Sequence, residues 1–262
     1  MQETSALYKQ IYESQNYVVE TALAIGEQGR LVTENNEVLL FGGDAILVGQ
    51  TGADGGYGEE MLLKVHTHRQ MFKDNHPEIG CCVAGEIDVE MFMPIGEIKS
   101  RAMVVPWARL VSTEDGTCSE WIKKGVFYID TRTNTRNRDS LDVLRFHGYD
   151  AMLMTEQMYE SSTLQFPAVD LDVVYEIASL INVQVDPRCV QYLNHQYLVK
   201  YPANYTMREV LSQIAMAYGG NWIMNDIGEL QFVPLWALPP ETSLLVDHLG
   251  NRLVFGEDRI LV

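Results

Sequence analysis

Positive charge is scarce in this chain. Its 262 residues contain 19 Lys and Arg against 36 Asp and Glu, which gives a formal net charge of −17. Proteins that bind DNA or RNA neutralise phosphates with cationic side chains, and a surface this acidic repels them. We therefore expect no sequence-specific contact with nucleic acid.

Long hydrophobic runs are also missing. No stretch approaches the roughly 18 apolar residues that a membrane-spanning helix needs. The first residues, MQETSALYKQ, lack the basic and then apolar pattern of a secretion signal. The sequence predicts a protein without a membrane span that is made in the cytoplasm.

Cysteine is rare, and the common enzyme motifs are absent. The four cysteines, Cys81, Cys82, Cys118 and Cys189, include a vicinal pair but no CxxC spacing, so we interpret them as reduced, half-buried thiols. Neither GxSxG nor HExxH occurs, and no histidine lies near Cys118 in the sequence, which favours a buried or edge thiol over a nucleophile. We predict a protein that is not an enzyme and has no catalytic residue, cofactor or metal.

The first part of the chain contains many short runs that are typical of strands. A short helix over Ser5–Ser14 precedes a first strand over Tyr17–Ile25. Further runs follow at Val38–Phe41, Ala45–Val48, Met61–Thr67, Gly85–Phe92, Ala102–Leu110, Gly125–Thr131 and Leu141–His147. Because no helical pattern separates them, they favour a sandwich or barrel. We expect this mainly β domain to end after a helical turn near Tyr149–Leu153.

The second part has helical periodicity. Val174, Ile177, Ala178 and Ile181 share one face of a helix that begins with Asp170 and Asp172, where the helix dipole favours acidic residues. A second helix is indicated by the capping-box spacing of Thr206 and Glu209, by an apolar face, and by Gly219 and Gly220 at its end. The apolar face of this second helix contains Val210, Leu211, Ile214, Ala215 and Tyr218.

A small hairpin and a further β segment complete the prediction. Two alternating runs, 221–225 and 229–233, flank a turn in which Gly228 takes a positive φ. Strand-like patterning resumes at Ser243–Val262. The predicted organisation begins with a β-barrel domain over residues 1–160. An α+β domain of two helices and a hairpin follows over 161–236. Residues 237–262 are expected to start a further β unit, for which a second barrel is an open alternative.

Three histidines form the one candidate metal site. His66 and His68 would share a face of their strand, and His76 is close in sequence. No downstream Cys or His cluster completes four ligands. We therefore prefer a pair of surface histidines to a metal site.

We interpret the glycine-rich and acidic segments as structural features, and not as catalytic or ligand-binding sites. Gly52, Gly55, Gly56 and Gly58 lack the Lys and the strand-to-helix transition of a phosphate-binding loop, so we predict a loop between strands. The acidic pairs Glu59–Glu60 and Asp170–Asp172 indicate a loop rim and a helix start, since the carboxylates of a glycosidase are defined by their separation across a sugar.

The four tryptophans lie in or beside predicted strands. They are Trp107, Trp121, Trp222 and Trp236. We expect at least two of them to fill a core. For Trp121, core filling and an interface role stay open alternatives.

Several segments of the sequence resemble one family. The run Ser119–Ile122, then Gly125–Asp130 (GVFYID), and the strand end Phe146–Asp150 resemble segments of phage tail hub proteins. Residues 77–80 and 86–88 resemble strands of the first barrel of that family. The predicted helix after Thr206 and the hairpin through Gly228 and Leu230 resemble its second domain. The order and spacing of these segments also match the family, and together the segments cover residues 17 to 233.

The resemblance implies a role as well as a fold. It points to the trimeric baseplate hub of contractile-tailed phages and to the amino-terminal region of tail-associated lysins and prophage endopeptidase tail proteins. A protein of this kind sits in the virion at the tail tip, as a homo-oligomeric ring below the tail tube through which DNA passes. Its partners would be tail tube, distal tail and tail-spike subunits. The alternative is the amino-terminal scaffold of a tail-borne cell-wall hydrolase or peptidase.

Overall fold

A computed structural model describes most of the chain. It covers residues 4–26, 56–73, 76–93, 98, 100–135, 142–160 and 162–235, together with six two-residue strands. Those short strands are β2 (Gly29–Arg30), β3 (Leu40–Phe41), β4 (Asp44–Ala45), β5 (Leu47–Val48), β16 (Val254–Phe255) and β17 (Asp258–Arg259). The predictions for 38–48 and for the tail from Ser243 therefore lie largely outside the described residues.

The longer elements match the sequence analysis closely. Their order is α1 (Ala6–Ser14), β1 (Tyr17–Gly26), β6 (Leu62–His68), β7 (Glu86–Phe92), β8 (Met103–Ser112), β9 (Ile122–Lys123), β10 (Phe127–Thr135), β11 (Val143–Asp150), η3 (Ala151–Glu156), β12 (Ala168–Val169), α2 (Asp170–Leu180), η4 (Pro187–Cys189), β13 (Leu198–Val199), α3 (Met207–Tyr218), β14 (Gly220–Met224) and β15 (Leu230–Pro234). The short elements β9, β12, β13 and η4 were not predicted, because two or three residues carry no periodicity.

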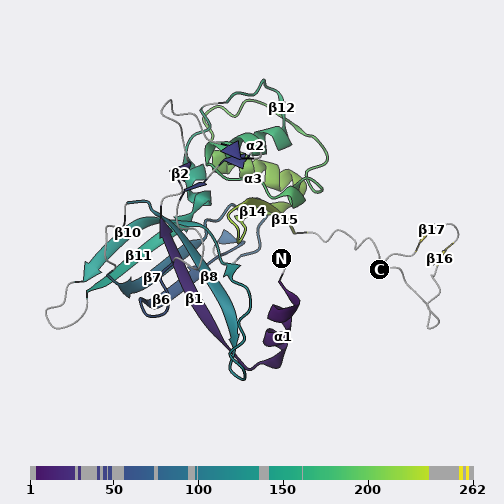
Figure 1. Ribbon diagram of the computed structural model, residues 1–262. Helices are drawn as coiled ribbons and strands as arrows, with labels where there is room; N and C mark the ends of the chain where they lie inside the picture. The colour runs from purple at the N-terminus through teal and green to yellow at the C-terminus, as the bar shows by residue number, and fades with distance from the viewer. Residues whose placement is uncertain are drawn as a thin grey trace.

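The strands before residue 151 form one antiparallel sheet with the order β1-β8-β10-β11-β7-β6, and β9 pairs with β8. The first pair is long and regular, from Tyr17 opposite Ser112 to Gly26 opposite Met103. Figure 1 shows this sheet on one side of the molecule and α2 and α3 on the other, with β14 and β15 between them.

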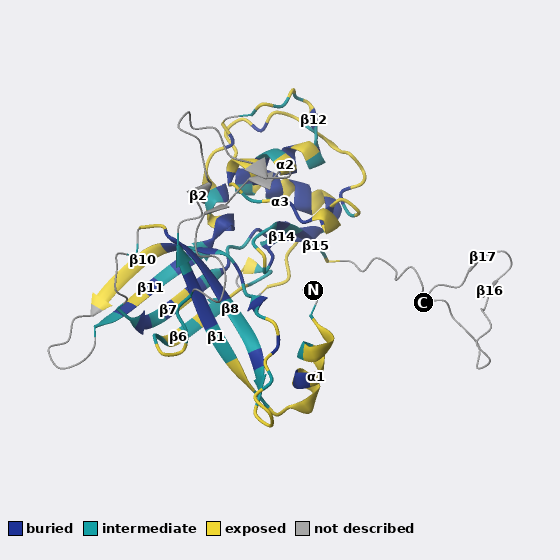
Figure 2. Cartoon of the chain, in the orientation of Figure 1, coloured by how far each residue is buried: buried dark blue, intermediate teal, exposed yellow. Residues whose placement is uncertain are grey.

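The sheet curls around its main apolar core, and Ala24, Met103 and Val105 form a smaller buried cluster. The pattern of β7 and β11 alternates between buried and more exposed residues, as expected when one face is covered. One cluster collects side chains from five strands and the residue before β8: Leu23, Ile87, Val89, Met91, Ala102, Val104, Phe127, Ile129, Leu144 and Phe146. Figure 2 shows the buried positions of these strands in dark blue, with continuous buried stretches on β1 and β8.

The two ends of the sheet approach each other at one point. Leu23 of β1 exchanges two backbone hydrogen bonds of 2.8 Å with Tyr57, which precedes β6. A Cβ on the adjacent Gly56 would lie 2.7 Å from the carbonyl oxygen of Leu23, so this approach requires glycine. The fold is mainly β with a smaller α+β part, as predicted. Full closure of the sheet into a barrel stays a prediction.

Both predicted helices of the second part are confirmed with their ends. Thr206 and Glu209 form the capping box at the start of α3, and Gly219 ends it with φ 68°. Asp170 and Asp172 lie in the first turn of α2. Gly228, with φ 89°, lies in the turn of the β14–β15 hairpin as predicted.

A second core lies between these helices, the hairpin and η3. Trp222 of β14 is fully buried at its centre, and its Nε1 donates to the carbonyl of Leu211 at 2.9 Å. The cluster also includes Cys82, Met152 and Tyr159, which precede residue 161. The second core thus draws side chains from both sides of the expected boundary, and the division at 160 and 236 stays a prediction.

Candidate interaction site

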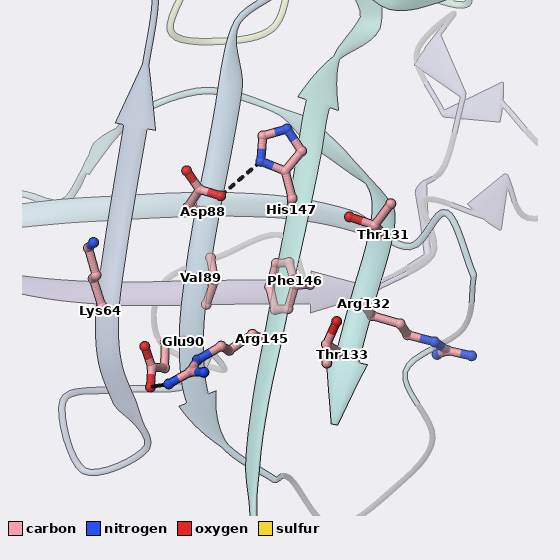
Figure 3. A pocket seen from close by; sticks show the side chains of 10 residues that line it. All are labelled: Lys64, Asp88, Val89, Glu90, Thr131, Arg132, Thr133, Arg145, Phe146 and His147. Atoms are coloured by element: carbon pink, nitrogen blue, oxygen red, sulfur yellow. Dashed lines mark hydrogen bonds and ion pairs between the residues drawn. The ribbon is translucent and has the colours of Figure 1, made fainter. Parts of the chain in front are cut away.

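The exposed face of the sheet carries rows of paired charges. In the register of β6, β7 and β11, Lys64 and Arg145 lie on either side of Glu90, and His66 and His147 on either side of Asp88. All of these except His66 line a shallow hollow of about 300 Å³, together with Thr131 and Thr133 of β10. Figure 3 shows the side chains that line it. Alternation along β6, β7 and β11 places their charged side chains on the face opposite the core. In β10, a register shift between Ile129 and Thr131 brings Thr131 opposite His147 on the same face.

An ion pair and a histidine–carboxylate hydrogen bond cross this polar face. Arg145 donates to Glu90 at 2.7 Å, and this hydrogen bond lowers the pKa of the Glu90 carboxyl. His147 Nδ1 lies 2.8 Å from an Asp88 carboxylate oxygen. Pairs this exposed contribute little to stability, but they set an alternating charge pattern that a partner surface can read.

The predicted histidine pair is on this face, without a metal arrangement. The rings of His66 and His68 have centroids 6.4 Å apart, and His68 contacts the Gln70 amide at 2.7 Å. Among the residues that the structure describes, no group of three or more His, Cys, Asp or Glu is arranged to hold a metal ion. The sequence analysis did not associate His147 with this pair, because only the strand register brings β11 beside β7.

The thiols are packing groups, except for Cys118. Cys81, Cys82 and Cys189 are buried, and Cys118 is exposed beside the edge of β8, where it bridges to Val111. Burial raises the pKa of Cys82 to about 12 and that of Cys189 to about 11. These two thiols therefore keep their protons at neutral pH.

Trp121 has an intermediate position, neither fully core nor freely exposed. The Arg109 guanidinium lies 4.4 Å from its ring centroid, and Arg109 also pairs with Glu20 at 2.6 Å. This cation–π contact fixes the ring at the surface of β8. Trp222 is the one tryptophan found fully buried within the described ranges, and Trp236 lies outside them.

The remaining predicted loop and helix-start positions agree with the structure where they are described. Glu59 and Glu60 lie in a turn before β6. Gly56 and Gly58 are described, whereas Gly52 and Gly55 are not. Asp170 begins α2, but its side chain is almost fully buried, which the sequence pattern did not indicate.

Asp150, which ends the Phe146–Asp150 segment of the resemblance, joins the sheet to the helical part. One carboxylate oxygen accepts from the Gly85 amide at 2.8 Å, and the other accepts from the Met152 amide at 3.0 Å. Burial raises the pKa of Asp150 to about 6, although these two bonds and the nearby Arg69 and Arg208 oppose the shift. The carboxylate thus caps η3 and fixes the start of β7 at the same time.

A second hollow lies in the helical part, between the segment 197–202 and α3. Its volume is about 340 Å³, and three exposed tyrosines, Tyr197, Tyr201 and Tyr205, line its rim. We call it the tyrosine hollow. The sequence analysis did not identify it, because its lining combines an irregular segment with one face of a helix.

Within the described ranges, no helix is both long and apolar enough to span a membrane. Comparison of the sequence with models of known protein families finds no match. Comparison with curated proteins finds none either.

Solved structures do match the fold. The 43 kDa tail protein of prophage MuSo2 from Shewanella oneidensis has a TM-score of 0.50 and 13% sequence identity, over 82% of this chain and 54% of that protein. The tail protein from Neisseria meningitidis MC58 has a TM-score of 0.44 and 13% identity, over 82% of this chain and 51% of its own. A chain of the half-lidded Francisella PdpA–VgrG complex has a TM-score of 0.45 and 7% identity. The match covers 86% of this chain and 34% of that chain.

At a sequence identity of 13%, the structural similarity shows a shared fold alone. This chain shares its fold with the MuSo2 tail protein and spans about half the length of the two tail proteins that it matches.

Proposed function

We propose that this chain is a non-enzymatic structural subunit of a phage or prophage tail, located in the tip or baseplate hub of the virion. The observation that carries the proposal is the fold shared with the MuSo2 tail protein over 82% of the chain. Fold alone does not define function. The tail-hub resemblance of the sequence, found independently of the structure, points to the same class.

The positions of the resembling residues support a scaffold role. Phe127 of the GVFYID segment is fully buried in the sheet core, and Ile122 and Ile129 are also buried. Asp150 joins the two parts of the molecule, as described above. These segments are therefore used for packing and for joining elements, which suits a subunit whose task is to hold a shape.

In this proposal the chain acts as a ring, a trimer, below the tail tube, with tail tube, distal tail and spike subunits as its partners. A net charge of −17 suits a channel for DNA, because an acidic wall keeps the duplex from adhering. We expect part of the acidic surface to face that channel. The ring and its stoichiometry rest on the resemblance alone.

Electron cryo-microscopy of purified tail particles tests the proposal. We expect density for this fold at the tail tip in a closed ring of three copies. Its absence from the tail, or its presence only in the tube, would overturn the placement. Acidic residues confined to the outer surface, with a basic inner wall, would overturn the channel.

A peptidoglycan-release assay with the purified chain tests the non-enzymatic part. We expect no release above that of a heat-denatured sample. Release that is lost on denaturation would favour the alternative of a tail-borne cell-wall hydrolase or peptidase.

A further inference from the structure

The tyrosine hollow has the size of a small-molecule site. Its volume of about 340 Å³ lies in the range of ligand pockets, which are roughly 300 to 1,000 Å³. We call four of its buried lining residues the floor, namely Val210, Ile214, Tyr218 and Asp170, and Val199 and Ala217 also line it. A ligand here would contact aliphatic groups and one carboxylate below and tyrosine rings around the rim.

The three rim tyrosines are exposed, and two of them, Tyr197 and Tyr201, are held by contacts with other rings. Tyr197, Tyr201 and Tyr205 are 47%, 48% and 43% exposed. The ring of Tyr197 lies 5.2 Å from that of Tyr218, and the ring of Tyr201 lies 5.2 Å from that of Phe166. Rings fixed by such contacts offer flat apolar faces at little entropic cost.

The floor offers a hydrogen-bond acceptor. Asp170 is 1% exposed, and its carboxylate accepts from the Leu171 amide at 2.8 Å, the Tyr197 amide at 3.3 Å and the Tyr218 hydroxyl at 2.5 Å. A carboxylate has about four lone-pair sites, which is one more than these three bonds use. The side chain of Gln213 adds both donors and an acceptor at the rim.

The charge of the lining narrows the ligand class. Lys200 and Asp170 are the only charged residues that line the hollow, so it lacks the cationic cluster that an anionic polymer requires. The net charge of −17 also repels such polymers. A neutral ligand with flat apolar faces and hydroxyl donors matches the lining.

We propose that the tyrosine hollow binds a neutral oligosaccharide, a function beyond the structural role proposed above. The tyrosine rings stack against the apolar faces of sugar rings, and Asp170, Gln213 and Lys200 bond to hydroxyl groups. A proline-rich peptide also stacks on tyrosine. Prolyl residues, however, have no backbone N–H to donate to the carboxylate at the floor.

A glycan array probed with the purified chain tests this proposal, followed by calorimetric titration of the strongest neutral oligosaccharide. Tyr201→Ala and Tyr205→Ala should each weaken binding by about tenfold or more, as expected for an aromatic side chain at the centre of a contact. Tyr201→Phe keeps the ring and should retain most of the affinity. The matched control is Tyr175→Ala, because Tyr175 is 46% exposed on α2 and does not line the hollow.

Three results would overturn the proposal. The first is an array without binding to any neutral glycan. The second is equal affinity in Tyr201→Ala, Tyr205→Ala and the control, which would place binding elsewhere. The third is binding of a proline decapeptide that excludes the sugar, which would assign the hollow to peptides. Near-ultraviolet circular dichroism checks the fold of each variant. If an alanine variant fails to fold, Leu198→Ser, at a rim residue that is 67% exposed, replaces it in the comparison.

Discussion

Buried polar side chains are rare in the described part of the sheet, whereas the helical part is held together by several of them as well as by its apolar core. Seven polar or charged side chains are buried in the described part of the chain, and all but Ser119 lie at or after Asp150: they are Asp150, Thr155, Asp170, Asp186, Asn221 and Asn225. In the sheet, the strand ladders satisfy the backbone. In the helical part, short elements and irregular segments leave amides and carbonyls that side chains must satisfy. The two regions should therefore respond differently to substitution.

The largest effect should come from Asn221, which is fully buried. Its side chain accepts from the Cys81 amide at 2.8 Å and donates to the carbonyls of Glu78 and Met71 at 3.0 and 3.2 Å. Asn221→Ala leaves these groups unsatisfied and should lower the free energy of unfolding by about 4 kcal/mol, as measured by urea denaturation. Asn194→Ala, at an exposed position, is the control. Equal costs for the two variants would mean that the buried hydrogen bonds of Asn221 do not stabilise the helical part.

Ile214 tests the apolar part of the same core. It is 5% exposed on α3, whereas Met216 on the same helix is 55% exposed. Ile214→Ala should cost about 3 kcal/mol through the cavity that it leaves, and Met216→Ala should change the unfolding free energy little. A neutral Ile214→Ala beside a costly Met216→Ala would reverse the assigned helix face.

The pH dependence of stability tests the role of Asp150, which joins the sheet to the helical part. Burial raises its pKa from 3.8 to about 6, so the folded protein binds this proton more tightly than the unfolded chain does. Stability should therefore fall as pH rises from about 4 to about 6, by on the order of 3 kcal/mol, and the penalty should then stay constant. Asp150→Asn cannot titrate. The unfolding free energy of the wild type, minus that of the variant, should decrease over this window and be flat above it. A difference that is constant from acid to neutral pH contradicts the assignment.

The cap of α3 should have a smaller effect. The Thr206 hydroxyl accepts from the Glu209 amide at 3.1 Å. Thr206→Ala should cost about 1 kcal/mol in unfolding free energy, and Thr206→Ser should restore most of it. A loss that serine does not restore would mean that the methyl group, and not the cap, is responsible.

The smallest effect is expected on the polar face of the sheet. The Arg145–Glu90 pair is exposed, with side-chain exposures of 58% and 29%. Arg145→Ala should leave the unfolding free energy almost unchanged, because solvent screens this exposed pair. Arg188→Ala in the helical part should cost more, because its partner Asp186 is 2% exposed and would lose a charged hydrogen bond. Equal costs for the two arginines would show that burial of the acidic partner does not matter here.

The sequence by itself determined the elements whose signals are local. The helices α2 and α3, the capping box of Thr206 and Glu209, and the Gly228 turn follow from spacings of two to four residues, and the structure has all of them. The strands of the sheet follow from alternation, which needs only a covered face. These features depend on neighbours in the chain, so the sequence contains what is needed to predict them.

Only the tertiary structure decided which distant residues meet. The strand register places His147 beside Asp88, and the fold brings Asn221 to Cys81, 140 positions away. The tyrosine hollow likewise combines an irregular segment with the face of α3. Hydrogen-bond partners across such distances leave no period in the sequence, because an amide or carboxylate at one position fits many possible partners. Which partner it finds depends on the packing of the two cores.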